Sequence, residues 1–367
     1  AKYESKILVR SWFFRIFTLL AVVFLGFFNF AMMLMEDNFG LWFAKSVSSN
    51  IPYLNLLLLN TGQAVVAVFL SSEFLKRDKK LDTSEVFYVR PLSNAEYVIG
   101  KIWGNLRVFL LLNLLVLAIV LAFNFMASGI TVDWQAYGVY FLLISLPTLI
   151  FIIGLSIFLM LVLRNQALTF ILLLGYIGLT LFYIQDKFYY LFDYMVYNLP
   201  LFKSTIVGFS SLELILNHRA IYFFAGLGFI FFTIFLFKRL PNARRSHYPW
   251  LFLSLCMFLL AGTAGYRHVR SILREGEIRA LYTSINNKYV HEPKIAIDWY
   301  DISVEQKPET ICSVVGMKGT ALATSEIFTF CLNPGLKVGE VKEGEKPLDF
   351  KREEQILAVD FGRKIEK

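Results

Sequence analysis

The sequence predicts an α-helical, polytopic membrane domain with about seven spans, followed by a small, mainly β domain outside the membrane. Hydrophobic residues make up 57% of the chain and charged residues 17%, and the mean hydropathy is +0.57. These values lie outside the range of soluble globular proteins. Apolar runs of membrane-spanning length recur as far as Tyr266, and alternating, strand-like patterns follow. The chain therefore reads as a membrane domain with a soluble module behind it.

Seven apolar segments approach the roughly 20 residues that a membrane-spanning helix needs. The first is followed by "MEDNFG" rather than by a small-residue cleavage site, so we expect a retained span and not a signal peptide. Between the fourth and fifth segments stands only "RNQ"; we expect two spans there, with one long helix kinked near Pro147 as the alternative. The predicted spans are residues 16–35, 51–71, 108–126, 137–163, 167–184, 221–237 and 250–266.

Lys and Arg gather in alternate loops, which predicts the orientation of the chain. Basic residues precede the first span and follow the second, fourth and sixth, whereas the opposite loops carry mainly acidic residues. This pattern predicts a cytoplasmic N-terminus and an extracytoplasmic C-terminal domain. The expected location is the inner (cytoplasmic) membrane. The net charge of +8 then reflects topology and contact with anionic lipids rather than nucleic-acid binding. The expected parts are 1–240 with six spans, 241–266 as the seventh, and 267–367 as a stem and β-sandwich-like domain.

A polar stretch between the second and third spans, "LDTSEVFYVRPLSNAEYVIGK" (residues 81–101), contains two helix-start signals. Asp82 is followed three residues later by Glu85, and Ser93 by Glu96, as in a capping box. Two helices are therefore expected to begin here.

Pro91 separates these two starts, because it supplies no amide and disfavours helical geometry at Arg90. The result is a broken elbow at a predicted cytoplasmic position. Its apolar surface could meet a partner protein or the lipid interface, and consists of Val86, Phe87, Tyr88 and Val89.

The run from Glu73 through "DTSEVFYVRPLSNAEYVIGKIWG" resembles the cytoplasmic segment of type-2 ABC exporter permeases, in which "P-[LIV]-S" precedes a "GK" at the third span. The matching positions here are Pro91, Leu92, Ser93, Gly100 and Lys101. The resemblance implies that this segment docks on an ABC ATPase subunit and that a second permease domain, in a homodimer or heterodimer, completes the pathway. The implied coupling residues are Glu85, Val86, Phe87, Tyr88, Arg90, Pro91, Ser93, Glu96 and Lys101.

Two other segments are similar to this family. The opening "KYESKILVRSWFFR" places Tyr3, Ile7 and Trp12 at near-helical spacing, as in an amphipathic helix on the cytoplasmic face. The aromatic segment "DKFYYLFDYMVYNLPLFKSTIVGFSSLELILNH" resembles short re-entrant helices at the outer end, with an aromatic belt at the headgroups as the alternative. A seventh span and an outer domain depart from the simple family pattern.

Polar residues inside predicted spans are candidates for a substrate pathway: Asn55, Asn60, Gln63 and Asn113. Hydrogen bonding between helices is the commoner use of such residues, and both interpretations stay open. The chain contains no G-x-x-x-x-G-K-[ST] loop, since Gly100 and Lys101 are followed by Ile102. We therefore expect no cofactor in this chain, with ATP and Mg²⁺ bound by a partner ATPase.

The last hundred residues read as a stem followed by antiparallel strands in "KIAIDWYDISVEQ", "SEIFTFCLNPG", "LKVGEVKEG" and "EQILAVDFG". The final 75 or so weakly resemble the N-terminal β-domain of the aminopeptidase N family. Zinc catalysis there needs H-E-x-x-H, which fails after His291 and Glu292 because Pro293 follows and position 295 is Ile295. We expect no enzyme here, with any catalytic part beyond Lys367. Cys312 and Cys331 could form a disulfide or remain buried free thiols.

Three functions from different classes follow. The favoured one is the transmembrane subunit of an ATP-driven ABC transporter, an exporter by its resemblance. A second is a membrane anchor for an extracytoplasmic metallopeptidase-like module. The third is a mechanotransmitting, non-transporting ABC-type subunit that uses ATPase strokes to rearrange its outer domain.

Overall fold

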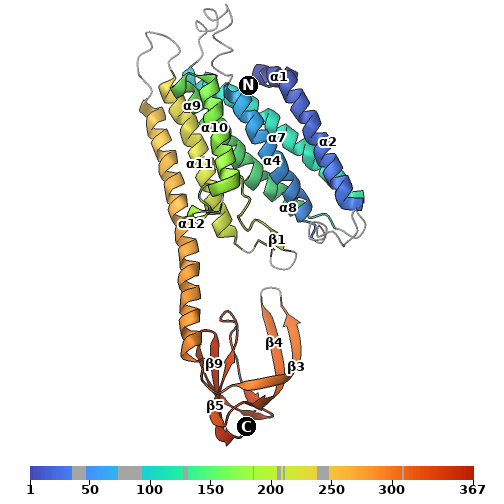
Figure 1. The fold of residues 1–367 in the computed structure, drawn as a ribbon, viewed down its shortest axis with the longest axis vertical. Helices are drawn as coiled ribbons and strands as arrows, with labels where there is room; N and C mark the ends of the chain where they lie inside the picture. The colour runs from blue at the N-terminus through green and yellow to red at the C-terminus, as the bar shows by residue number, and fades with distance from the viewer. Residues whose placement is uncertain are drawn as a thin grey trace, which may run out of the picture. The chain divides into compact units, whose positions relative to one another are not determined.

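A computed structural model describes residues 1–34, 47–72, 93–126, 131–184, 186–204, 208–209, 211–237, 248–307 and 310–367. They form two compact units, residues 1–271 and residues 272–367 (Figure 1). Within these described ranges, seven helices are long and apolar enough to cross a membrane. The predicted architecture, mostly helical with seven such helices and a small β region at its C-terminal side, is therefore confirmed at this level.

Each of the seven predicted spans overlaps one of these seven helical segments. The predicted ends differ at residue 35, which lies outside the described residues, and at residue 237, one position beyond α11. Several helices begin earlier than their apolar runs, because polar first turns lower the hydropathy. The fourth segment is composite, with a π-helical turn in its middle. The helices that begin in the first unit are α1 (Lys2–Arg10), α2 (Trp12–Leu34), α4 (Asn50–Ser72), α7 (Asn94–Met126), α8 (Trp134–Tyr140), η2 (Phe141–Ser145), α9 (Leu146–Leu163), α10 (Gln166–Leu179), η3 (Thr180–Ile184), α11 (Leu212–Leu236) and α12 (Tyr248–Lys288), of which α12 continues into the second unit.

The predicted break between the fourth and fifth spans is confirmed at residues 164–165. Arg164 ends α9 in the left-handed conformation, with φ of 54°. Asn165 then caps α10, because its side-chain oxygen accepts a hydrogen bond from the Leu168 amide at 3.2 Å. The alternative of one long kinked helix is therefore wrong, although the fourth segment does carry a π-helical turn just before Pro147.

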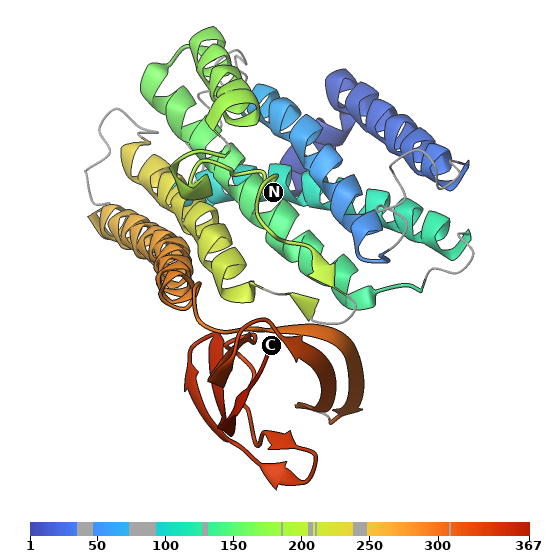
Figure 2. The same ribbon diagram turned by 60° about the horizontal axis from the view of Figure 1, so that its bottom comes forward.

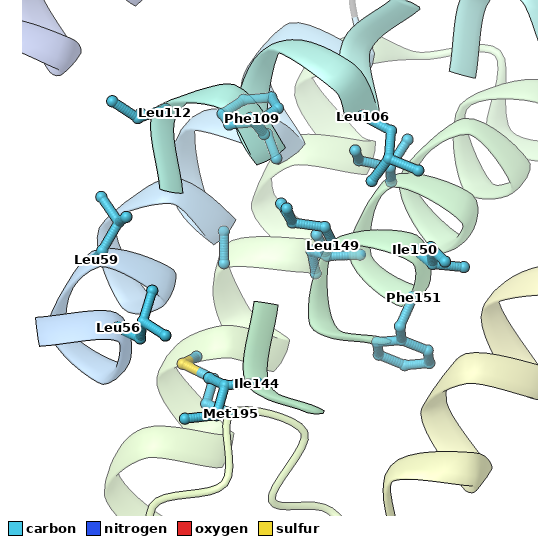
Figure 3. Packing of buried hydrophobic residues seen from close by; sticks show 14 of the residues in the cluster. Leu56, Leu59, Leu106, Phe109, Leu112, Ile144, Leu149, Ile150, Phe151 and Met195 are labelled. Atoms are coloured by element: carbon cyan, nitrogen blue, oxygen red, sulfur yellow. The ribbon is translucent and has the colours of Figure 1, made fainter. Parts of the chain in front are cut away.

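Helix α9 is the centre of the bundle, between α4 and α11 (Figures 1 and 2). Side chains from α4, α7 and α9 converge in its core, and Met195 from the chain between α10 and α11 joins them (Figure 3). Helices α9 and α11 approach closely at Gly154 and Gly226: a Cβ at Gly154 would lie 2.7 Å from the Gly226 carbonyl oxygen. Small residues permit such backbone contact in lipid, where burial of apolar surface adds little to helix association.

Residues 186–204, the interhelical segment between α10 and α11, do not form the expected re-entrant helices. The segment contains one 3-10 turn, η4 (Phe188–Tyr190), and ends in β1 (Lys203–Ser204), which pairs with β2 (Gly208–Phe209). Its backbone is left-handed at Phe188, Tyr189 and Tyr190, with φ of 51°, 59° and 62°, and again at Val196. Successive left-handed residues are incompatible with a right-handed helix, which explains the difference.

Helix α12 is longer than the predicted seventh span, because the polar stem continues it without interruption to Lys288. In the second unit it is followed by β3 (Ile295–Gln306), β4 (Ile311–Ala321), β5 (Ser325–Cys331), β6 (Lys342–Glu343), β7 (Lys346–Pro347), β8 (Asp349–Glu353) and β9 (Ile356–Ile365).

These strands form a β3–β4 hairpin, a sheet in the order β5–β9–β8 and a small β6–β7 hairpin, all antiparallel (Figure 2). Strands predicted near 294–306, 325–335 and 354–362 are confirmed, whereas 336–344 yields only the two-residue β6. Cys312 lies in β4 and Cys331 in β5, and both are free and exposed. The structure thus has neither the disulfide nor the buried thiols.

Candidate functional site

Three of the predicted coupling residues belong to the described residues: Ser93, Glu96 and Lys101. The other six, Glu85, Val86, Phe87, Tyr88, Arg90 and Pro91, lie outside them. Ser93 and Glu96 form the predicted capping box: the Glu96 amide donates to Ser93 Oγ at 3.1 Å, and the Ser93 amide donates to Glu96 Oε2 at 2.8 Å. Helix α7, which contains the third predicted span, therefore starts at the predicted capping signal, directly after Ser93.

Lys101 lies beneath α1 and is only 3% exposed. Its Nζ is 3.2 Å from Glu4 Oε1, and Ser5 Oγ donates to the Gly104 carbonyl at 2.9 Å. A Cβ at Gly104 would come within 2.7 Å of the Glu4 side chain, so this glycine permits the close approach of α1. The "GKIWG" sequence thus holds the N-terminal helix against the first turns of α7.

The side of α1 that packs on α7 differs from the predicted apolar stripe. Its buried residues are Ser5 and Leu8, whereas Tyr3 and Trp12 are exposed. Exposed aromatic side chains at a helix that borders the spans are typical of an interfacial helix.

Three of the four predicted pathway residues meet in a closed ring of hydrogen bonds, the amide ring, which Ser145 of η2 completes. Asn60 donates to Ser145 Oγ at 3.1 Å, Ser145 to Asn113 Oδ1 at 2.8 Å, Asn113 to Gln63 Oε1 at 2.8 Å, and Gln63 to Asn60 Oδ1 at 2.5 Å. All four side chains are fully buried. The ring joins α4, α7 and η2 through neutral groups whose donors and acceptors satisfy one another.

The fourth pathway candidate, Asn55, pairs with Asn29 of α2 instead. Asn29 Nδ2 donates to Asn55 Oδ1 at 2.7 Å, and Asn55 Nδ2 donates back at 3.0 Å. This reciprocal amide pair is likewise buried, and it links α2 and α4. Within the described residues, the pathway candidates thus hydrogen-bond between helices in the observed conformation.

A second polar cluster surrounds Arg219 of α11. Its guanidinium donates to the carbonyl oxygens of Leu143 and Tyr194 at 2.6 and 3.0 Å, and to Thr148 Oγ1 at 2.8 Å. Pro147 has no N–H to donate to the carbonyl four residues earlier, at Leu143. Arg219 therefore supplies the hydrogen bond that the helix lacks at this point.

Further donors hold the interhelical segment by its main-chain carbonyls. Tyr222 Oη donates to the Leu191 carbonyl, and Thr148 Oγ1 donates to that of Tyr194 at 3.1 Å. The imidazole Nε2 atoms of two histidines lie 3.0 and 2.8 Å from the carbonyl oxygens of Tyr190 and Tyr189. We call this set the carbonyl clamp; its members are Thr148, His218, Arg219, Tyr222 and His268.

Asp193 stabilises the turn that follows the clamped carbonyls. Its carboxylate accepts hydrogen bonds from the amides of Tyr197 and Asn198, at 3.0 and 2.8 Å. Burial raises the pKa of this carboxyl above its ordinary value, although these amides and the positive charge of Arg219 act in the opposite direction. The interhelical segment thus has a left-handed backbone and a buried carboxyl group, that of Asp193, near the buried guanidinium of Arg219.

Sequence reasoning missed Asn29, Ser145 and all five members of the carbonyl clamp. A signal for the clamp exists in the sequence, because His218 and Arg219 stand within a helical apolar stretch, and ionisable residues in spans are rare. The predicted sixth span began at residue 221 and left both outside. Ser145 carries no comparable signal, because its ring partners come from distant parts of the chain.

The two clusters offer helix-to-helix hydrogen bonds and main-chain anchoring, and none of the described residues forms a group of three or more metal-ligating side chains. The contacts of both clusters are hydrogen bonds to other side chains or to main-chain carbonyls. No family model, curated protein or solved structure matches the chain.

Proposed function

We propose that the chain is the transmembrane subunit of an ATP-driven ABC transporter, an exporter of the type-2 class. In this proposal the chain lies in the inner membrane with its N-terminus in the cytoplasm and its β unit on the opposite side. A separate ATPase subunit binds ATP and Mg²⁺, and a second permease domain completes the pathway. The proposal rests on the resemblance of residues 73–104 and on the surroundings of the part of that run that the structure describes.

The packing of α1 on α7 is the observation that supports it best. The capping box at Ser93 fixes where α7 starts, and Gly104 and Lys101 hold α1 against the same first turns. Helix α7 has 33 residues and is about 50 Å long, which exceeds the hydrocarbon thickness of about 30 Å. A force applied to the chain just before Ser93 would therefore move α7 and α1 together.

The proposal predicts that Phe87 and Tyr88 contact the ATPase. Replacing both by aspartate would bury unpaired carboxylates in that interface, which costs several kcal/mol and lowers affinity by more than about a hundredfold. Copurification of the ATPase with the full chain from membranes measures the loss. Ser93→Ala is the control, because it removes only a helix cap worth about 1 kcal/mol and leaves the apolar contact.

An ATPase that stays bound to the double aspartate variant at unchanged affinity would overturn the assignment of this elbow. Membrane insertion and folding of the variant are verified by the elution profile of the detergent-solubilised protein. A strictly monomeric particle that retains a functional ATPase would contradict the paired-permease arrangement.

One observation favours the mechanotransmitting alternative. Helix α12 has 41 residues and extends without a break from an apolar half into the β-bearing unit. Glu277→Pro would interrupt that helix at an exposed position. If ATP-dependent transport into vesicles persists in this variant, an unbroken α12 is not needed for transport. If the native chain shows no transport, and ATP changes the conformation of its β unit only when α12 is unbroken, the mechanotransmitting function is supported.

A further inference from the structure

Two histidines of the carbonyl clamp, His218 of α11 and His268 of α12, lie against each other in the bundle. Both are fully buried, and their ring centroids are 5.0 Å apart with the planes tilted by 52°. Neither has a role in the proposed function. Both rings belong to the first compact unit.

The hydrogen bonds assign the protonation of the two rings. Each Nε2 lies at a carbonyl oxygen, of Tyr190 for His218 and of Tyr189 for His268. A carbonyl only accepts, so Nε2 carries the hydrogen in both rings, and Nδ1 of the neutral ring is an acceptor. Both Nδ1 atoms are buried and have no hydrogen-bond partner among the described residues. Two adjacent, unpartnered acceptor nitrogens form a place where a proton can bind.

The charges around the pair oppose a proton there. Arg219 follows His218 on α11, and its guanidinium repels a positive imidazolium. From α12 the facing titratable group is His268 itself, and on α11 the Tyr222 ring lies 5.3 Å from the His218 ring. Asp193 of the interhelical segment acts on Arg219 and Tyr222. A proton added to the pair would thus form a buried cation next to an existing one.

The backbone that the two imidazoles hold is left-handed at Phe188, Tyr189 and Tyr190. Non-glycine residues in this conformation are strained, and they persist only where surrounding contacts hold them. The two Nε2–H donors bind the carbonyls of two of these three residues. Displacing either ring would remove a contact that keeps the strained backbone in place.

We propose that the His218–His268 pair is a proton-binding site, and that its occupation releases the interhelical segment. When one Nδ1 takes up a proton, repulsion by Arg219 displaces the charged ring, its Nε2–H leaves the carbonyl, and residues 188–190 relax. The proton adds to a lone pair, and no other bond forms or breaks. This device stands independently of any transported substrate.

Hydrogen–deuterium exchange of the full chain in detergent tests the proposal. Amides of residues 187–198 are compared at about pH 7.5 and about pH 4.5, after correction for intrinsic rates. The lower pH lies well below the ordinary imidazole pKa of about 6.5, because burial and the charge of Arg219 oppose protonation of the pair. We expect at least a tenfold loss of protection at the lower pH. Amides of α9 serve as the internal reference and should change by less than twofold.

His→Gln substitutions provide the matched variants, because a glutamine amide can still donate to the carbonyl but does not titrate in this range. The double variant H218Q/H268Q should keep the segment equally protected at both pH values. The single variants H218Q and H268Q should each reduce the pH response at least threefold. If the double variant does not fold, these single variants test whether the histidine pair binds the proton. His268→Ala, which has no donor, should lose protection at both pH values.

Asp193 is the competing titratable group, because its carboxylate holds the adjacent turn. Asp193→Asn keeps an accepting oxygen without the titration, and it should retain the full pH response. A response that persists in H218Q/H268Q, a response that disappears in Asp193→Asn, or a native segment equally protected at both pH values would each overturn the proposal.

Discussion

The amide ring and the carbonyl clamp are both buried among apolar helices, yet they satisfy their hydrogen bonds in opposite ways. In the amide ring, the donors and acceptors that join the helices are side chains. In the carbonyl clamp, side chains donate mostly to main-chain oxygens of a non-helical segment and of a helix interrupted at Pro147. The first cluster joins helices that are already complete, and the second supplies bonds that the backbone does not make itself.

This difference determines which cluster tolerates replacement. Exchanging both partners of a side-chain hydrogen bond for apolar groups can be nearly neutral, because no polar atom remains unpaired. A main-chain carbonyl cannot be removed by substitution, so the loss of its donor always leaves a buried acceptor unsatisfied. The amide ring should therefore be replaceable as a unit, whereas the carbonyl clamp should not.

The largest expected effect is that of Arg219→Met. The variant leaves the carbonyls of Leu143 and Tyr194 without this donor and removes the positive charge that acts on Asp193. We expect a loss of about 3 kcal/mol or more in the free energy of unfolding, measured by denaturant titration in detergent. Arg219→Lys should fall between this variant and the native chain, because it keeps the charge but not the planar fork.

Arg164→Met is the matched control for this prediction. Arg164 is exposed at the end of α9, and among the described residues its side chain donates to no buried carbonyl, unlike that of Arg219. Its replacement should change the unfolding free energy by about 0.5 kcal/mol or less. Equal losses for the two arginines would show that the clamp contributes nothing specific.

The amide ring should show a smaller and non-additive effect. Gln63→Leu alone leaves Asn60 Oδ1 without its donor, and we expect a loss of about 1 kcal/mol. Replacing the whole ring, by N60L, Q63L, N113L and S145A together, should cost less than the sum of the four single losses. The same titration in detergent measures all five variants. Strictly additive losses would show that the amide ring is not replaceable as a unit, because unpaired polar atoms would then not be the source of the lost unfolding free energy.

The sequence predicted the features that depend on neighbouring residues. Apolar runs indicated all seven helices, and the Ser93–Glu96 spacing indicated where α7 starts, because both signals are local. Ser145 could not be assigned to the amide ring, since its partners lie 32 and 85 residues away. Packing of distant segments, which a single sequence does not reveal, brings them together.

The interhelical segment and the β unit show the same limit. The left-handed backbone at Phe188 to Tyr190 depends on donors from α11 and α12, so its own residues could not predict it. Strand β4 was not expected, because Gly316 and Gly319 weaken its strand pattern. Its long pairing with β3, rather than its own composition, establishes it as a strand.

The smallest effect is expected where both partners are side chains and water is close. Asp133 caps α8 by accepting from the Ala136 amide at 3.0 Å, and its carboxylate accepts two hydrogen bonds from Lys203 Nζ, at 2.8 and 2.7 Å. Partial burial acts to raise the pKa of Asp133, but the hydrogen bond from Lys203, the amide bond and the lysine charge outweigh it and hold the pKa below its ordinary value. The ion pair ties the end of the interhelical segment to α8.

A carboxyl whose pKa is lower in the folded chain stabilises the fold above its unfolded pKa, about 3.9, and loses that contribution as the pH falls through the folded value. Asp133→Asn keeps a capping oxygen but no charge, so we expect it to cost up to about 1 kcal/mol between about pH 5 and about pH 7. Below about pH 4 the difference between variant and native chain should shrink, because the native carboxylate is itself becoming protonated. Unfolding free energies across this range measure it. Asp186→Asn, at an exposed position of the interhelical segment, is the control and should change the unfolding free energy by about 0.5 kcal/mol or less. A deficit that is as large below about pH 3 as at neutral pH would show that packing, rather than the charge of Asp133, holds Lys203 in place.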